Sequence, residues 1–507
     1  MDALFAPLAS ALGASVDQIK LIFCLLVAYP LGSVFIRIPS STPTLRHLFN
    51  VVVAISFFAA LRLYGAFFQL LASIVGTYLI VKYDRSTRMP WIVFVFVMGH
   101  LMINHIIRAV YGFSYETIEI TGPQMVLTMK LTTFAWNVWD GRRPTEDLDK
   151  WQLSKRVTEY PSLLAFLGYA FYFPGILVGP YLDYQEYSDL INETTFKKLE
   201  AGDKAKASRL IPNGRKRVAY WKMLTGLIYL GTFVVLGGSH NFAVALTPWF
   251  ASQPLLYRIV AFQIYGTFER SKYYAIWTLT EGASILTGLG FTGFGPNGES
   301  TWEGAANVKV KQIEFAPNFK VLLDSWNMKT NVWLRECVYK RVTPKGKKPG
   351  NMSSMITFFT SAFWHGIAGG YYLTFMFGGF VTTAARLVRA GVRPLLLPGP
   401  DEQPSTAKQL YDLGGIVLSI MIVNYAAAPF MLLSVKDSLT TWSRLGWYGH
   451  VIIFGAMVFF YGGGTKYFRR LQKEKGIAPS VKQSNGTTTP IPSLAAPLDK
   501  FAPPAEK

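Results

Sequence analysis

Apolar blocks long enough to cross a lipid bilayer constrain the fold of this chain more than any other feature of its sequence. Each block is bounded by charged or turn residues, and many approach the roughly 20 residues that a bilayer core requires. Charged residues make up only 16% of the 507 positions, which argues against a string of soluble domains. We expect an all-α polytopic membrane protein with about eight to eleven spans. The candidates lie at about 19–38, 47–65, 66–82, 90–110, 161–181, 219–237, 242–264, 273–291, 353–380, 413–435 and 447–463.

Several blocks are broken by glycine or proline, as in "FYFPGILVGPY" at 171–181. A break that faced lipid would leave backbone groups without hydrogen bonds, so we expect such segments to lie inside a helical bundle or to line a cavity. No repeat of fixed length is visible in the sequence, which disfavours a transporter built from inverted repeats.

The formal net charge of +20 is concentrated in three stretches, at 197–217, 340–350 and 466–475. The positive-inside rule places such stretches on the cytosolic side of the membrane. They could serve as orientation signals alone, or they could also attract a phosphate-bearing ligand or acidic lipid headgroups. We expect no nucleic-acid partner, because the sequence predicts no soluble domain to present a binding surface.

We expect residues 1–465 to form the membrane-embedded domain and residues 466–507 to form a cytosolic, disordered tail. From Ala478 onward the chain is rich in proline, serine and threonine and has no apolar period. The amino end lacks the basic region of a secretory signal, so we expect it to be retained.

Cysteine and histidine usage argues against a metal site. Cys24 and Cys337 are the only cysteines, too few for a disulfide framework or a cysteine-rich metal centre. His100 and His105 are five residues apart, which puts them on different faces of a helix, and no carboxylate or thiolate accompanies them. We expect these two histidines to make polar contacts between helices.

The stretch "SAFWHGIAGGYYLTF" at 361–375 places His365 in a charge-free run from Met355 to Phe380. An ionisable residue inside a membrane is a functional hypothesis by default. The small residues after it allow another chain or a ligand to approach the backbone, and the neighbouring aromatic rings can wall a pocket. A cavity around the imidazole is therefore predicted, while a hydrogen bond to a neighbouring helix remains the structural alternative.

The preceding stretch "DSWNMKTNVWLRECVYKR" at 324–341 mixes aromatic and basic residues at the edge of the hydrophobic region. One interpretation is an amphipathic helix on the membrane surface, anchored by its tryptophans. The other is a cytosolic entrance for a charged substrate, with Asn327 turned inward toward His365.

These two residues suit the transfer of an acyl group from a thioester to an alcohol. Histidine is the side chain whose unperturbed pKa fits a general base near neutral pH. The carboxamide of Asn327 can donate a hydrogen bond to the developing oxyanion without adding a charge. A sheltered site also keeps water from hydrolysing the thioester. Ser361 or Cys337 could instead carry the acyl group covalently, an alternative that the sequence leaves open.

The residues around His365 resemble the histidine motif of the membrane-bound O-acyltransferase family. The stretch around Asn327 resembles the asparagine motif of the same family. Segments 121–142 and 172–187 are similar to signatures of its lysophospholipid acyltransferase branch. Gly369 departs from the pattern, since many relatives carry proline there. The histidine motif is met by Trp364, His365, Gly366, Gly370, Tyr371 and Phe375.

The resemblance implies a bundle of about eleven transmembrane helices around an internal tunnel, with re-entrant and amphipathic helices and a motif-bearing core at about 120–380. It implies a multi-pass protein of the endoplasmic reticulum membrane that moves an acyl chain from acyl-CoA, a co-substrate, to the free hydroxyl of a lysophospholipid. No cofactor and no metal are expected, and the partners are acyl-CoA, lysophospholipid and membrane lipids. A diacylglycerol, sterol or protein acceptor is an alternative, and a membrane transporter is a more distant one.

Three groups of site residues follow from the chemistry and the resemblance together. The catalytic pair is His365 as general base with Asn327 assisting it. Candidates for contacts with acyl-CoA, chosen by charge and position, are Trp326, Lys329, Arg335, Tyr339 and Lys340. Candidates that support the site or bind substrate are Asp140, Glu281, Trp364 and Tyr371. Headgroup preference, acyl-chain preference and oligomeric state have no signature in the sequence.

Overall fold

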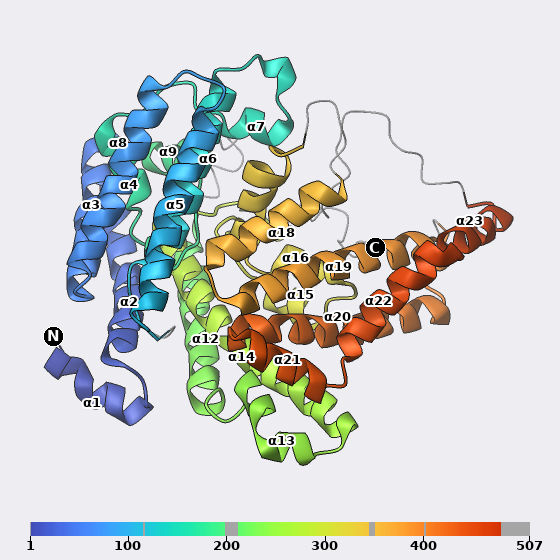
Figure 1. Ribbon diagram of the computed structural model, residues 1–507. Helices are drawn as coiled ribbons and strands as arrows, with labels where there is room; N and C mark the ends of the chain where they lie inside the picture. The colour runs from blue at the N-terminus through green and yellow to red at the C-terminus, as the bar shows by residue number, and fades with distance from the viewer. Residues whose placement is uncertain (1, 115–116, 198–210, 344–349, 400–401, 478–507) are drawn as a thin grey trace. The chain divides into compact units, whose positions relative to one another are not determined.

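A computed structural model describes residues 2–114, 117–197, 211–343, 350–399 and 402–477 of the chain. Within them the fold is almost entirely helical (Figure 1), and the single sheet is a ribbon of two antiparallel strands, β1 (Gly293–Phe294) and β2 (Ser300–Thr301). The chain divides into two compact units, each with its own hydrophobic core. The first unit contains residues 1–236 and 270–307, and the second contains residues 237–269 and 308–507.

In the first unit a run of short helices separates long helices earlier in the sequence from long helices later in it. Helix α14 (Leu255–Leu286) is shared, because its residues from Arg270 onward belong to this unit. The other helices are α1 (Asp2–Leu12), α2 (Val16–Phe35), α3 (Pro43–Ala60), α4 (Tyr64–Tyr83), α5 (Met89–Val110), α6 (Thr121–Gly141), η1 (Thr145–Asp147), α7 (Lys150–Lys155), α8 (Leu163–Ala170), α9 (Tyr184–Asn192), α10 (Thr194–Lys197) and α12 (Arg215–Leu236).

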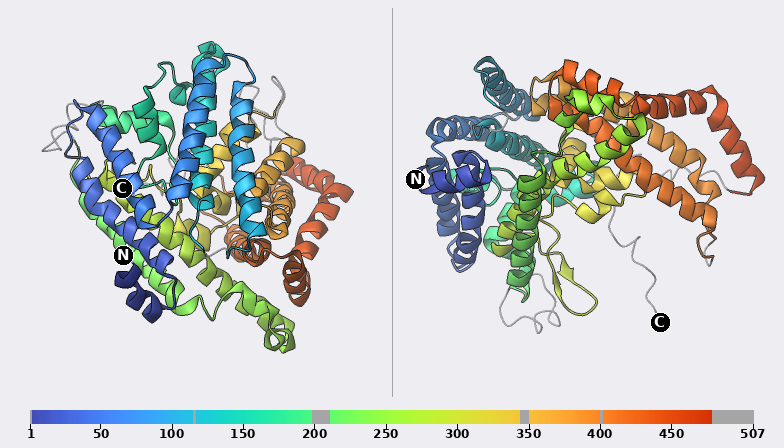
Figure 2. Two further views of the ribbon diagram at one scale, coloured as in Figure 1. Left: turned by 60° about the vertical axis from the view of Figure 1, so that its left-hand side comes forward. Right: turned by 90° about the horizontal axis from the view of Figure 1, so that it is seen from below.

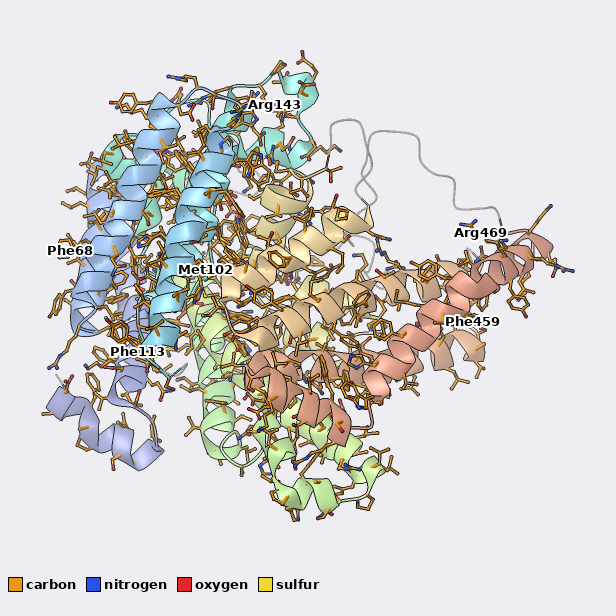
Figure 3. The ribbon with its side chains drawn as sticks, in the orientation of Figure 1. Phe68, Met102, Phe113, Arg143, Phe459 and Arg469 are labelled. Carbon is orange, nitrogen blue, oxygen red and sulfur yellow. The ribbon has the colours of Figure 1, made fainter. Side chains whose placement is uncertain are left out.

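Helices α3, α4, α5 and α6 lie side by side (Figures 1 and 2). Apolar side chains point outward from this layer, as Phe68 of α4 does with 66% of its surface exposed (Figure 3). An exposed apolar face of that kind suits contact with lipid. Helix α6 differs, because nearly all of its side chains are buried.

Buried Lys130 of α6 holds the end of α8 in place. Its ammonium group donates hydrogen bonds to the carbonyls of Tyr169 and Ala170, at 2.8 and 3.1 Å, which are the last two residues of α8. A lysine that binds the final carbonyls of a helix satisfies groups that have no partner within the helix.

The expectation of a membrane span at 161–181 is wrong. Helix α8 has only eight residues, and the chain continues through a non-helical segment with a cis bond between Gly179 and Pro180. Most side chains of that segment are buried, which confirms the expectation that a segment broken by proline and glycine lies inside the protein.

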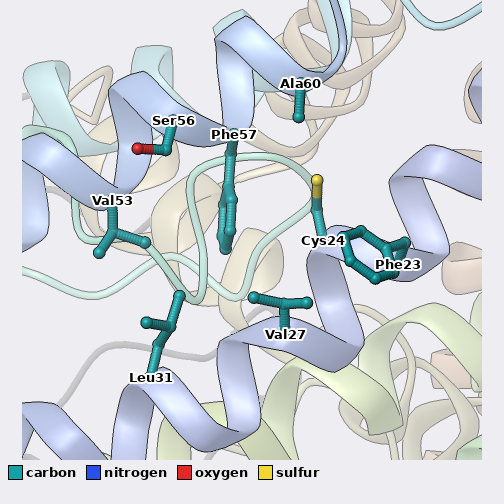
Figure 4. A pocket seen from close by; sticks show the side chains of 8 residues that line it. All are labelled: Phe23, Cys24, Val27, Leu31, Val53, Ser56, Phe57 and Ala60. Atoms are coloured by element: carbon teal, nitrogen blue, oxygen red, sulfur yellow. The ribbon is translucent and has the colours of Figure 1, made fainter. Parts of the chain in front are cut away.

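A groove of about 300 Å³ runs between α2 and α3 (Figure 4). The polar groups in its lining are the hydroxyl of Ser56 and the thiol of Cys24, and the other lining side chains are apolar. The Ser56 hydroxyl donates to the carbonyl of Val52 on its own helix at 2.9 Å, so its hydrogen bond is already made. Both helices are long and apolar enough to cross a membrane. The groove suits lipid chains. Its lining residues are Phe23, Cys24, Val27, Leu31, Val53, Ser56, Phe57 and Ala60.

In the second unit short helices come first, and the two longest helices that lie wholly within it, of 23 and 27 residues, come later. Residues of α14 up to Glu269 belong to it. Its other helices are η2 (Phe242–Leu246), α13 (Pro248–Ser252), α15 (Val310–Glu314), α16 (Phe319–Ser325), α17 (Met328–Trp333), the π-helix η3 (Leu334–Tyr339), α18 (Asn351–His365), α19 (Gly369–Gly391), η4 (Arg393–Leu395), α20 (Thr406–Leu432), α21 (Val435–Arg444), α22 (Tyr448–Phe459), the π-helix η5 (Phe460–Gly464) and α23 (Thr465–Glu474).

Helix α19 is central to the second unit and packs against α18, α20 and α22. Tyr425 of α20 and Trp442 of α21 join the core of this unit, with their rings stacked at a centroid distance of 5.4 Å. The indole nitrogen of Trp442 also donates to the carbonyl of Tyr425 at 2.9 Å. The second unit therefore has a packed aromatic core beside the helices that carry the histidine motif.

Seven helices in the described part of the chain are long and apolar enough to span a membrane. This supports a multi-pass protein, but it does not confirm the expected count of eleven. The spans expected at 242–264 and 273–291 do not exist as separate crossings, because α14 runs without interruption for 32 residues. The span expected at 353–380 is divided into two helices. The seven are Val16–Phe35, Pro43–Ala60, Tyr64–Tyr83, Met89–Val110, Arg215–Leu236, Thr406–Leu432 and Tyr448–Glu474.

The expected disordered tail does not begin at 466, because Thr465–Glu474 forms helix α23. The side-chain amide of Gln472 donates to the carbonyls of Ala390 and Gly391, at 2.9 and 2.7 Å. Exposed Phe459 of α22 is thus followed by the basic residues of α23, among them Arg469 (Figure 3). Most of the expected tail lies outside the described residues, as do parts of the other two basic stretches.

Candidate active site

His365 is the last residue of α18, at a reversal of the chain. The next residue, Gly366, has φ of 132°, a conformation that side-chain-bearing residues rarely adopt, and its amide donates to the carbonyls of Ala362 and Phe363 at 3.2 Å. Helix α19 begins three residues later and packs against α18. The reversal explains why a single span at 353–380 was wrong, and it places the imidazole at the tip of a helical hairpin.

Four aromatic rings surround the imidazole. The ring of Phe375 stacks on it at a centroid distance of 5.1 Å and an interplanar angle of 18°. The rings of Trp364 and Tyr371 lie at 4.6 and 5.5 Å, so these two predicted residues do wall the histidine. His365 itself stays half-buried, which leaves part of the imidazole accessible. Apolar faces of this kind exclude water from the ring.

The fourth ring, Phe430 of α20, has no signal in the sequence that links it to the site. Its centroid lies 4.8 Å from that of His365, nearly perpendicular at 86°, and 4.9 Å from that of Tyr371. It sits in an ordinary apolar helix, far along the chain from any motif. The structure therefore shows that α20 contributes a ring to the enclosure of His365, a contact that the sequence did not predict.

Gly370 brings α20 to the start of α19. Its amide donates to the carbonyl of Leu433 at 2.7 Å, and a Cβ atom at this position would lie 2.0 Å from the carbonyl oxygen of Pro429. No larger side chain fits without displacing that backbone. The expectation that the small residues after His365 allow a close approach is confirmed, and the approaching segment belongs to this chain. Phe430 lies within that segment.

Asn327 occupies a strained position between two short helices. It precedes α17 with φ of 46° and ψ of 51°, the left-handed region that asparagine tolerates better than most residues. The side-chain amide of Asn331 donates to the carbonyls of Leu323 and Trp326, at 2.9 and 2.6 Å, and holds the turn. Backbone strain of this type is common at functional sites. The half-buried Asn327 and Trp326 therefore stand on a fixed turn.

The expected amphipathic helix over 324–341 is not continuous. The chain forms the end of α16, the turn at Asn327, α17 and the π-helix η3, in which the amide of Lys340 donates to the carbonyl of Arg335 at 3.1 Å. Single π-helical turns are frequent near functional sites. Because η3 packs against α18, the asparagine segment joins the helix that ends at His365.

A tryptophan pair strengthens this junction. Trp333, at the end of α17, is fully buried, and its ring centroid lies 5.6 Å from that of Trp364. Trp364 in turn contacts His365. The asparagine and histidine motifs therefore belong to the same unit and meet through this pair of rings. The two residues considered as covalent nucleophiles, Ser361 and Cys337, are both buried.

The basic residues proposed for acyl-CoA are partly neutralised. Glu336 has 1% of its side chain exposed and pairs with Arg335 at 2.7 Å and with Lys340 at 2.6 Å. One carboxylate therefore offsets half of the charge of these two cations. Lys329 is half-buried, and Tyr339 is buried. The spacing of Glu336 from its two partners is visible in the sequence, but its burial is not.

Asp140 and Glu281 lie in the first unit, where each carboxylate is paired with a basic residue. Asp140, at the end of α6, is fully buried and lies 3.4 Å from Arg143. Glu281 of α14 has 1% of its side chain exposed and lies 2.9 Å from the ammonium group of Lys222 of α12. These contacts fit the interpretation that the two acids order helices.

His100 makes the polar contact between helices that we expected. Its ring nitrogens lie 2.7 Å from the hydroxyl of Ser73 and 3.3 Å from the amide oxygen of Gln69, both on α4. His105 is buried on α5. In the ranges that the structure describes, no three histidine, cysteine, aspartate or glutamate residues are grouped as metal ligands would be.

Helices long and apolar enough to cross a membrane, together with a histidine enclosed by aromatic rings, suit a membrane-embedded transferase. The chain belongs to the membrane-bound O-acyltransferase family, whose model matches residues 105–428. It is 38% identical to the lysophospholipid acyltransferase of Schizosaccharomyces pombe over 91% of this chain and 89% of the relative. Identity to the lysophospholipid acyltransferase of Saccharomyces cerevisiae is 36%, over 98% of this chain and 83% of the relative. The human membrane-bound glycerophospholipid O-acyltransferase 2 is 30% identical to this chain, over 94% of this chain and 90% of the relative.

Proposed function

We propose that this protein transfers a fatty acyl group from acyl-CoA to the free hydroxyl of a lysophospholipid, as a phospholipid-remodelling enzyme of the endoplasmic reticulum membrane. The basic stretches would then face the cytosol, where acyl-CoA is available. The observation that carries the proposal is His365 at the tip of the α18–α19 hairpin, enclosed by four aromatic rings. Family membership and the names of the two yeast relatives support the reaction and the acceptor.

The reaction assigns one role to each catalytic residue. A ring nitrogen of His365 takes the proton of the acceptor hydroxyl while that oxygen attacks the thioester carbonyl carbon. The amide of Asn327 donates a hydrogen bond to the oxyanion that forms. The carbon–sulfur bond then breaks, and the departing thiolate of coenzyme A takes the proton from the imidazolium. The enzyme returns to its starting state, and the products are a phospholipid and free coenzyme A.

The enclosing rings have a chemical purpose in this scheme. Water that reached the thioester beside an active base would hydrolyse it. Phe375 and Phe430 cover the imidazole with apolar surface, and Tyr371 adds a ring whose hydroxyl provides a polar tip. The half-buried imidazole leaves room for the acceptor hydroxyl to approach.

The decisive assay supplies membranes containing the full-length protein with labelled oleoyl-CoA and a panel of lysophospholipids, and identifies the products by mass spectrometry. Diacylglycerol, a sterol and an acceptor peptide are tested in parallel. Labelled phospholipid from the lysophospholipids alone supports the proposal. Label in another acceptor would redirect it to a different O-acyltransferase, and flux across sealed vesicles without any labelled product would support a transporter.

Substitution of the base gives the matching test of mechanism. We expect His365→Ala to lower the turnover number by about 10² to 10⁴, the usual contribution of a general base. His240→Ala is the control, because His240 belongs to the same unit and none of the four rings around His365 contacts it. Near-normal transfer by the His365 variant would show that the imidazole is not the base.

A further inference from the structure

A second cavity in the second unit is separate from the rings around His365. It has a volume of about 560 Å³ and lies among α16, α19, α20 and α22. This volume is typical of sites for small molecules. None of the four rings that enclose His365 lines it. Its lining residues include Lys320, Arg386, Arg389, Leu418, Ile422 and Ile453.

One end of this cavity is cationic and the other is apolar. Arg386 and Arg389 stand near the end of α19, and Arg389 interacts electrostatically with Tyr411 near the start of α20. Farther along α20, Ile422 packs into the same core cluster as Val381 of α19. The cavity therefore has the polarity of an amphiphile, with a place for an anion at one end and for a hydrocarbon chain at the other.

The protein offsets only part of the positive charge at the cationic end, because Asp324, which pairs with Lys320, is the carboxylate that also attracts Arg389. No acidic residue is among the lining residues. Lys320 is paired with Asp324, whereas the contacts of Arg386 with described residues are two long ones, at 3.4 Å, to neutral oxygens of Asn351 and Thr383. Across the described ranges, neither Arg386 nor Arg389 forms an ion pair with a carboxylate. Two arginines so placed suit a phosphate group, which the planar guanidinium binds through paired hydrogen bonds.

We propose that this cavity binds an intact anionic glycerophospholipid from the surrounding bilayer. Its phosphate contacts Arg386 and Arg389, and one acyl chain lies along Leu418, Ile422 and Ile453. In a multi-pass membrane protein the bilayer supplies such molecules at high local concentration, and an acidic headgroup adds attraction to a site with excess positive charge.

The distance along α19 separates this lipid from the reacting acceptor. Phe375, which stacks on His365, and Arg389 are 14 residues apart on one helix, a rise of about 21 Å. The free hydroxyl of a lysophospholipid is only a few bonds from its phosphate. An acceptor held at Arg389 therefore could not present its hydroxyl to His365, so the proposed ligand is not the acceptor in its reactive position.

The test measures binding of dioleoyl phosphatidylserine and dioleoyl phosphatidylcholine to the full-length protein in detergent, by native mass spectrometry. We expect the paired change Arg386→Gln and Arg389→Gln to weaken phosphatidylserine binding roughly tenfold or more, because two charge-assisted contacts are lost. Glycerol 3-phosphate and oleate, as separate probes, should each bind much more weakly than the whole lipid.

A second variant fills the cavity without altering its charge. Gly414 of α20 lines the cavity, and a Cβ atom there would meet nothing within 4 Å. We expect Gly414→Leu to abolish phosphatidylserine binding. Gly455→Leu is the matched control, because Gly455 lies on α22, also has open space at its Cβ position and does not line the cavity. This control should bind as the unchanged protein does.

Acyl transfer in micelles free of phosphatidylserine separates this proposal from the proposed function. Transfer and its KM for oleoyl-CoA should be unchanged in the arginine and Gly414 variants. Unchanged phosphatidylserine binding in both would overturn the lipid site and leave the acyltransferase assignment intact. A rise in KM for oleoyl-CoA without loss of phosphatidylserine binding would also overturn it, because the arginines would then serve the phosphates of coenzyme A.

Discussion

Replacing Gly370 by alanine tests whether the approach of α20 to α19 builds the active site. The added methyl group would lie 2.0 Å from the carbonyl oxygen of Pro429 and 2.8 Å from Cα of Leu433, both backbone atoms. Such overpacking costs typically 1–3 kcal/mol. The amide of Gly370 also donates to Leu433 at 2.7 Å, and loss of that bond adds about 1 kcal/mol. We expect Gly370→Ala to lower the free energy of unfolding by roughly 2–4 kcal/mol.

The same variant should lose activity beyond its loss of stability. Phe430 follows Pro429 directly, so a shift of this backbone moves a ring that covers His365. We expect the turnover number of the folded fraction to fall at least tenfold, since small misplacements near a reacting centre have effects of that size or larger. Oleoyl transfer and unfolding in mixed micelles would be measured on the same preparation.

Gly378→Ala, on the same helix, is the control for this experiment. A Cβ atom at Gly378 meets only a ring atom of Phe358, at an ordinary 3.7 Å. Alanine in a helix interior is about 1 kcal/mol more favourable than glycine, so this variant should be neutral or slightly stabilised. If Gly370→Ala matched Gly378→Ala in both stability and turnover, the tight contact between α19 and α20 would not be what positions the site.

Two further predictions concern Asn327 of the second unit and the Lys222–Glu281 pair of the first unit. Glycine at position 327 tolerates the left-handed backbone but lacks the side-chain amide. We therefore expect Asn327→Gly to fold normally and to have a turnover number lower by about 10² to 10³, the usual effect of losing one oxyanion donor. Wild-type turnover in this variant would exclude that role for Asn327. Lys222→Met leaves the buried Glu281 carboxylate without its ammonium partner at 2.9 Å. We expect the free energy of unfolding to fall by about 2–3 kcal/mol, less than for a fully buried pair because Lys222 is one-third exposed. Adding Glu281→Gln should recover part of that loss, and equal stability of the single and double variants by chemical denaturation would mean that the pair does not stabilise the fold.

The catalytic motifs could be predicted because their information is local. Trp364 and Tyr371 stand within seven residues of His365, so one helical hairpin is enough to bring all three together. Phe430 could not be predicted in this way. Its place depends on the backbone contact between Gly370 and the end of α20, and nothing in the sequence pairs those two segments.

The errors in the expected spans have a common cause. Averaged hydropathy measures how apolar a stretch is but does not register a change of chain direction within it. Gly366 reverses the chain in the middle of a charge-free run, and the prolines and glycines after Ala170 end a helix that composition alone would continue. The opposite error concerns α14, whose charged residues make its sequence look like two separate spans. The structure has one helix there, which continues through Arg270.

The position of Phe430 also has a consequence for biosynthesis. This ring follows His365 by 65 residues, which a ribosome adding about 5–20 residues per second supplies only several seconds after the histidine. Until α20 has been made and inserted, His365 of the nascent chain lacks the contact with the ring of Phe430. Messages truncated before this helix should therefore yield chains that contain both the asparagine and the histidine motifs and remain catalytically silent.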